Sequence, residues 1–155
     1  METNNITRES IKKCRPELYF VNILIAIDTI NRKIKNISFK KFIEDEVIFG
    51  TIAFGIKEII KNLKLLNSFS HNINFKGCDT HMAEHFPAKS QKLFLTAKEE
   101  IPIFEKQFFE FLEKIGNKTY ILKAINYTIP IYEKMHRHES VEYLKMSSNK
   151  LKQVQ

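Results

Sequence analysis

Two histidines and a glutamate lie close together in the segment HMAEH, residues 81–85. On a helix, His81 and His85 project from one face a turn apart, so their imidazoles can hold a zinc ion while Glu84 activates a water molecule. Peptidases with this H-x-x-E-H pattern have much longer chains that form a substrate chamber. A third zinc ligand would have to be one of Cys78, Asp79, His71, His136 and His138. Metal-dependent hydrolysis is therefore the least favoured hypothesis, and we expect no metal site and no cofactor.

A second pair of histidines lies in the segment MHRH, residues 135–138. Its imidazoles and the Arg137 guanidinium could contact phosphate or a metal ion in the folded chain. On a continuous helix, however, a spacing of two residues points His136 and His138 to different faces, which argues against a joint pair of ligands. We interpret this segment as solvated surface.

Other patterns of catalytic residues are missing from the sequence. There is no glycine-rich phosphate loop and no Ser-His-Asp or Cys-His ordering in a recognisable context, which excludes those enzyme classes. Cys14 and Cys78 have no C-x-x-C spacing and are too few for a disulfide framework, so we expect reduced thiols. A set of phenylalanines could stack on bases, but helical spacing places most of them in a core: Phe94, Phe104, Phe108, Phe109 and Phe111.

The composition is typical of one helical domain. Of 155 residues 43% are hydrophobic, with 13 Phe but only 4 Gly and 4 Pro, which argues against a disordered chain and a turn-rich β-sandwich. No apolar run reaches about 18 residues and no apolar signal segment is visible, so we expect no membrane span and a cytoplasmic location. A net charge of +7 permits binding to a polyanion such as RNA.

Apolar residues at steps of three and four predict the helices. In chain order we expect a flexible arm over 1–16, a helix from 17 to about 36, and a second helix that is capped by Ser38 and unbroken to Leu66. A loop over 67–80 and a short helix to about Phe86 should follow, and then a helix to Gly116 that is bent at Pro102. The last helix should restart at Pro130 and end near Met146, before a polar tail. The predicted fold is an all-α bundle of four to five helices over 17–116 with a helical extension over 117–155.

The middle of the second predicted helix, residues 47–56, is apolar around the whole helical wheel. Such a segment must be covered on more than one side, either within its own bundle or by a second subunit. Gly50 and Gly55 would allow another backbone to approach closely. We predict a central core helix here, which is compatible with a homodimer interface.

Two blocks of the sequence resemble the HepT-like branch of the HEPN superfamily, small helical toxins found beside minimal nucleotidyltransferase antitoxins. The first block, residues 23–66, has an amphipathic helix, a short link with Ser38 and Phe39, and a long helix. The second, EEIPIFEKQFFEFL at 99–112, has an acidic pair, an apolar residue and a proline. The resemblance covers about residues 19–115. It implies an up-down HEPN bundle, a homodimer and a nucleotidyltransferase-type antitoxin as partner.

The nuclease motif of that family, an Arg followed by a His and then a Tyr, is matched only in part by residues 78–87. The resemblance implies that His85 is the general base of a metal-independent RNA cleavage, since an imidazole titrates near pH 6.5. No arginine lies in this stretch, and Pro87 stands where the family has its tyrosine. Lys76 could approach from the loop as the cation, although an ammonium lacks the planar grip of a guanidinium on phosphate. We take Lys76 and His81 as candidate RNA contacts.

Two functions therefore remain open at the level of sequence. The chain is either an RNA endonuclease with His85 as its base, or a non-catalytic helical module that binds a nucleotidyltransferase partner or RNA. The missing arginine and tyrosine favour the second.

Overall fold

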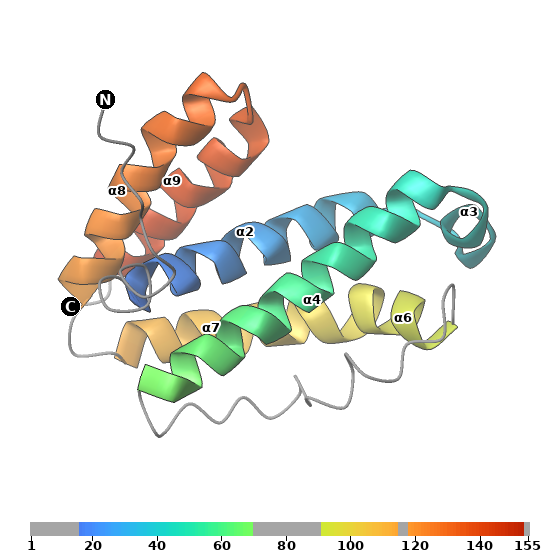
Figure 1. Cartoon of the computed structure of the whole chain (residues 1–155), viewed down its shortest axis with the longest axis horizontal. Coiled ribbons are helices and arrows are strands. Elements are labelled where there is room, and N and C mark those ends of the chain that lie inside the picture. The colour runs from blue at the N-terminus through green and yellow to red at the C-terminus, as the bar shows by residue number, and fades with distance from the viewer. Residues whose placement is uncertain (1–15, 70–90, 115–117, 154–155) are drawn as a thin grey trace, which may run out of the picture.

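The computed structural model describes residues 16–69, 91–114 and 118–153. These residues form helices and turns, with no strand among them, so the predicted all-α fold class is confirmed for this part of the chain. The elements, shown in Figure 1, are α2 (Pro16–Ile34), α3 (Phe39–Glu44), α4 (Glu46–Phe69), α6 (Gln91–Leu95), the π-helical turn η1 (Thr96–Glu100), α7 (Ile101–Lys114), α8 (Lys118–Lys134) and α9 (His138–Gln153).

Helix α2 is the centre of the fold. It packs along the length of α4 and also contacts α7, α8 and α9, whereas α4 packs mainly against α2. Figure 1 shows α4 and α7 running antiparallel to α2, with the α8–α9 hairpin standing at one end of this layer. Helix α2 is therefore apolar on most sides, and its fully buried side chains include Ile23, Leu24, Ile27 and Ile30.

The second predicted helix is not continuous, because the chain breaks at Asp45. Ser38 caps the six-residue α3 as predicted, its hydroxyl accepting a hydrogen bond from the Lys41 N–H at 3.2 Å. The Asp45 carboxylate then accepts hydrogen bonds from the N–H groups of Val47 at 3.0 Å and Ile48 at 3.2 Å, and so begins α4. These backbone hydrogen bonds hold the pKa of Asp45 below its ordinary value, and the bond from Ile48 has the largest effect.

The apolar segment 47–56 is covered on one side only by the described residues, which corrects the prediction of a central helix. Val47 is 70% exposed and Phe54 is 65% exposed. Gly50 has no atom within 4 Å of the place where a Cβ would stand. Gly55 does permit a close approach, since a Cβ there would lie 2.8 Å from Cγ1 of Ile30 on α2.

The helix that begins at Gln91 is irregular just before Pro102, the residue at which the sequence predicts a bend. Its second turn is the π-helical η1, in which the N–H of Ile101 donates to the carbonyl of Thr96, five residues back. Pro102 has no N–H to donate, and a widened turn just before it accommodates that gap. The phenylalanines of this helix occupy the core as expected, with Phe104, Phe108 and Phe109 buried.

The end of the chain differs from the prediction in two places. Pro130 lies inside α8 and does not start a new helix. The break falls instead at residues 135–137, where His136 has a φ of 57° and reverses the chain direction. The predicted polar tail is helical to Gln153, because α9 buries Ser147, Ser148 and Leu151 against the rest of the fold. Among the described helices, none has both the length and the hydropathy of a membrane span.

Candidate functional site

The residues to which the sequence assigns catalysis or RNA contact are His85, Lys76 and His81, with Glu84 as a further zinc-site residue. All of them lie between α4 and α6, outside the described residues. Within the described ranges, no three His, Cys, Asp or Glu side chains stand close enough together to hold a metal ion. The site described below is therefore a different one.

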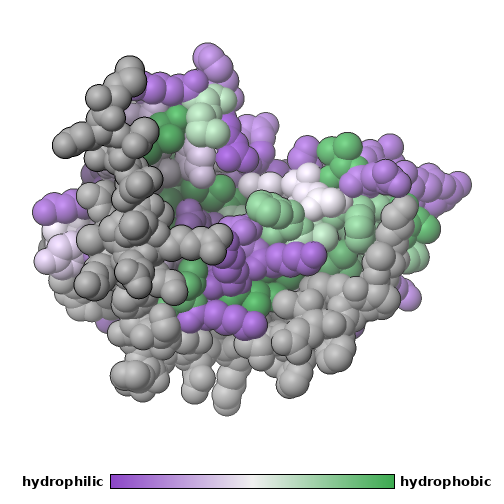
Figure 2. Space-filling model, in the orientation of Figure 1, coloured by the Kyte–Doolittle hydropathy of each residue, from purple (hydrophilic) through white to green (hydrophobic). Residues whose placement is uncertain are grey.

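A groove of about 450 Å³ crosses the exposed face of α2. Figure 2 shows this face hollowed between the α8–α9 hairpin and α4, in the orientation of Figure 1. We call it the α2 groove. Its lining residues are Asn22, Ile25, Ala26, Thr29, Gly50, Thr51, Phe54, Gly55, Glu58, Tyr132 and Arg137.

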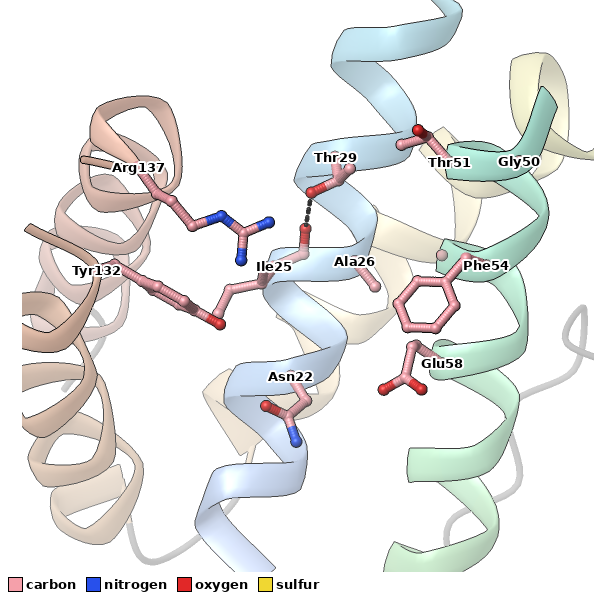
Figure 3. A pocket seen from close by; sticks show the side chains of 11 residues that line it. Asn22, Ile25, Ala26, Thr29, Gly50, Thr51, Phe54, Glu58, Tyr132 and Arg137 are labelled. Atoms are coloured by element: carbon pink, nitrogen blue, oxygen red, sulfur yellow. Dashed lines mark hydrogen bonds between the residues drawn. The ribbon is translucent and has the colours of Figure 1, made fainter. Parts of the chain in front are cut away.

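One wall of the α2 groove is the face of α4 that carries Phe54 and Glu58, one turn apart. Figure 3 shows the Phe54 ring and the Glu58 carboxylate side by side on this wall. The lining also includes small residues, Ala26 of α2 and Gly50 of α4 among them. An exposed ring beside a carboxylate offers a flat apolar surface and hydrogen-bond acceptors to the same ligand.

The opposite wall comes from the end of α8 and the turn that follows it. The Arg137 guanidinium lies 5.2 Å from the centroid of the Tyr132 ring, and both side chains point toward α2 in Figure 3. The backbone N–H of Arg137 donates to the Tyr132 carbonyl at 3.0 Å, which fixes the turn. Among the described residues, no carboxylate forms a salt bridge with Arg137. Its positive charge therefore faces the groove without a counter-ion from that part of the chain.

Asn62 orders the polar groups at the end of the groove where Asn22 lies. It is 2% exposed, and its carbonyl oxygen accepts a hydrogen bond from Nδ2 of Asn22 at 3.1 Å. Its own Nδ2 donates to the backbone carbonyl of Glu58 at 2.7 Å and lies 3.5 Å from Oε2 of the same residue. One buried amide thus holds a lining residue of α2 and a lining residue of α4 in fixed positions.

An ion-pair cluster on the far end of α2 holds the other wall in place. Nη2 of Arg32 lies 2.8 Å from Oδ2 of Asp28, and the same guanidinium bonds Glu139 in the first turn of α9. Glu139 follows Arg137 by two residues, so this contact lies next to the groove wall. Burial raises the pKa of Asp28, and the hydrogen bond from Arg32 opposes that rise.

A second, partly buried cluster ties α9 to α7 and α2. The Tyr143 hydroxyl donates to Oε2 of Glu105 at 2.7 Å, and Nδ2 of Asn31 donates to the same oxygen at 3.4 Å. Burial and the neighbouring carboxylate raise the pKa of the Tyr143 phenol. The α8–α9 hairpin is therefore anchored to α2 at two points, which makes the groove a fixed feature of the fold.

The MHRH segment was expected to be solvated surface with its histidines on different faces. His136, Arg137 and His138 are indeed exposed. The argument from a continuous helix is wrong, since α8 ends before His136 and α9 begins at His138. The two imidazole centroids lie 6.1 Å apart. Arg137 is the residue of this segment that lines the α2 groove. The sequence marked it as a possible phosphate contact only because it is an arginine.

Comparisons of this chain with protein-family models, with curated proteins and with solved structures give no match.

Proposed function

We propose that this chain is an RNA-binding helical protein of the HEPN/HepT type. In this proposal it acts in a toxin–antitoxin or defence pair, with a minimal nucleotidyltransferase as its partner. The order of α2, a short link with α3, and the long α4 supports the proposal, because it agrees with the family's first two helices.

The observation that carries RNA binding is that Arg137 lines the α2 groove together with two aromatic rings, the exposed Phe54 and the partly buried Tyr132. A guanidinium that has no counter-ion among the described residues is suited to grip a phosphate through its planar fork. Tyr132 beside it and Phe54 on the opposite wall offer faces on which unpaired bases stack. A cation next to stacking surfaces is the combination found in sites for single-stranded nucleic acid.

A row of lysines extends this site along α4. Lys57, Lys61 and Lys64 are exposed and follow Phe54 at helical spacing on the outer face of the helix. Such a row attracts a phosphate backbone over a distance limited by salt screening. The net charge of +7 adds to this attraction.

The groove's part in binding is tested by fluorescence anisotropy with a short, unstructured, labelled RNA. We expect Arg137→Gln to weaken binding about tenfold and to lower the salt slope by about one, as for the loss of one phosphate contact. Lys106→Gln, which removes an exposed charge from α7, is the matched control and should leave affinity unchanged. Equal losses in both variants would show that binding is not located at the groove.

RNA binding serves both a nuclease and a non-cutting module, and a cleavage assay separates them. Total RNA and tRNA are incubated with the purified chain in EDTA, beside His85→Ala. Cleavage that survives EDTA and disappears in the variant would assign the metal-independent nuclease. With the family's arginine and tyrosine missing, we expect binding without cleavage.

The proposal also includes protein partners, an antitoxin of the nucleotidyltransferase type and a second copy of the chain. An exposed apolar row on α8 supports a contact surface, since Tyr120, Tyr127 and Ile131 are 52%, 56% and 43% exposed. Light scattering of the wild type and of Ile131→Glu tests the homodimer. If the wild-type protein has the molar mass of a single chain even at high protein concentration, the homodimer is removed from the proposal.

A further inference from the structure

The end of the α2 groove where Glu58 and Asn22 lie has more specific chemistry than RNA binding requires. Glu58 presents a carboxylate, which only accepts hydrogen bonds, beside the Phe54 ring on which a base would stack. Asn62 steadies Glu58 through its backbone carbonyl at 2.7 Å and lies near its Oε2 at 3.5 Å. An acceptor therefore lies where it would meet the edge of a base stacked on Phe54, and there it would discriminate between bases.

Asn22 adds a donor next to that acceptor. Its Nδ2 gives one hydrogen bond to Asn62 at 3.1 Å, and an amide nitrogen has a second N–H to give. Since Asn62 contacts both residues, the Asn22 amide and the Glu58 carboxylate lie at the same end of the groove. The groove therefore presents a pair of acceptor oxygens with a donor beside them.

Guanine is the base whose edge matches this arrangement. Its Watson–Crick edge carries two adjacent donors, N1–H and the 2-amino group, followed by the O6 acceptor. Adenine and cytosine each present one donor beside a ring acceptor, and uracil presents one donor between two acceptors. A carboxylate that accepts from both guanine donors would meet a lone pair on each of the other bases, and a buried mismatch of this kind is costly.

We propose that the α2 groove recognises a guanine nucleotide, with Glu58 accepting from N1–H and the 2-amino group, Asn22 donating to O6, Phe54 stacking on the base and Arg137 binding the phosphate. This inference rests on the proposed function for the role of Arg137. A volume of about 450 Å³ is in the range of small-ligand sites.

The test uses the full chain and oligouridines that differ only in one central base. We expect the oligonucleotide with a central guanine to bind about tenfold more tightly than those with adenine, cytosine or uracil, as one bidentate base contact gives. Inosine in place of guanine lacks the 2-amino group and should lose most of this preference. The inosine measurement needs no variant of the protein, so it does not depend on the folding of a mutant.

Glu58→Gln then identifies the residue that reads the base. A glutamine amide presents a donor beside an acceptor, which matches adenine, so the variant should lose the guanine preference and favour adenine. Its affinity for plain oligouridine should stay at the wild-type value. Glu110→Gln on the exposed face of α7 is the matched control and should keep the guanine preference.

The source of the guanine is resolved by competition with free GMP and AMP. GMP that binds as tightly as the guanine oligonucleotide would assign a free nucleotide as the ligand, and much weaker GMP would assign RNA. Either result keeps the guanine site.

The outcomes also separate this inference from the proposed function. Arg137-dependent RNA binding that is equal for all four bases overturns the inference and leaves the proposed function standing. Absence of RNA binding overturns the proposed function, and GMP binding lost in Glu58→Gln would then still support the guanine site. No binding of either RNA or GMP overturns both.

Discussion

Arg32 holds Asp28 with two donors on a single oxygen. Nε lies 3.0 Å and Nη2 2.8 Å from Oδ2 of Asp28, one helical turn away on α2. The remaining Nη1 bonds Glu139 on α9, so one guanidinium joins the central helix to the hairpin that forms a wall of the groove. The two arginines of the described chain therefore have different roles, Arg32 within the fold and Arg137 at the groove.

Replacing Arg32 by Met should lower the free energy of unfolding by about 2 kcal/mol at neutral pH, because it leaves the Asp28 carboxylate buried without a cation. Burial already raises the pKa of Asp28 in the folded chain. An acid with a raised folded-state pKa binds more protons folded than unfolded, so its penalty applies above that pKa and is relieved as the pH falls toward 3.8.

Urea denaturation of Arg32→Met at several pH values measures this effect. The difference from the wild type should shrink on acidification. Glu139→Gln, whose side chain is 72% exposed, serves as the control and should cost well under 1 kcal/mol. A loss in Arg32→Met that does not change with pH would contradict the account of Asp28.

The two glycines of α4 should respond oppositely to alanine. At Gly55 a Cβ would lie 2.8 Å from Cγ1 of Ile30, a fully buried side chain, so Gly55→Ala should destabilise the fold by about 1–2 kcal/mol. At Gly50 nothing lies within 4 Å, and the higher helix propensity of alanine should stabilise by about 0.5–1 kcal/mol. Thermal and urea denaturation of both variants tests the pair. A Gly55→Ala variant as stable as the wild type would refute the close α2–α4 packing at Ile30, and a destabilised Gly50→Ala variant would contradict the open space at Gly50.

Tyr143 should ionise only when the protein unfolds in alkali. Its hydroxyl donates to Glu105 at 2.7 Å, and burial raises its pKa above the ordinary value of 10.0. A phenol with a raised pKa binds its proton more tightly in the folded state, so stability falls as the pH rises above 10.0. An alkaline titration followed by phenolate absorbance should show a delayed step from Tyr143, and Tyr143→Phe should remove that step.

Tyr143→Phe should also lower stability at neutral pH by about 1–2 kcal/mol, since it removes a hydrogen bond to a charged acceptor. Tyr120→Phe is the matched control, because its side chain is 52% exposed on α8. A delayed step that persists in Tyr143→Phe would assign the protected phenol to another tyrosine.

The helical class and several helix ends could be predicted from the sequence because they depend on local patterns. The Ser38 cap is of this kind, and so is the irregularity at Pro102, which takes the form of a π-helical turn just before it. The sequence does not reveal the break at Asp45, because Ile43 and Val47 keep the apolar spacing on both sides of it. Pro130 was misread as a helix start. The carbonyl of Asn126 that it leaves unbonded lies on an exposed residue, where water can satisfy it.

The central position of α2 and the groove could not be predicted because both depend on tertiary packing. Helices α2 and α4 have similar apolar patterns, so the sequence does not show which of the two is covered by α7, α8 and α9. Asn22, Phe54 and Arg137 come from three separate segments and have no shared spacing in the sequence. Of the three, only Arg137 belongs to a segment that stands out in the sequence, the MHRH segment with its two histidines.

The position of α2 also constrains the order in which the fold can be completed. It leaves the ribosome before every other described helix, and α8 and α9, which cover its flank, leave last. A nascent chain therefore exposes an apolar strip of α2 until the final hairpin has emerged, and translation that stops before Lys118 should yield an aggregation-prone product. The hairpin that forms one wall of the groove thus also closes the core.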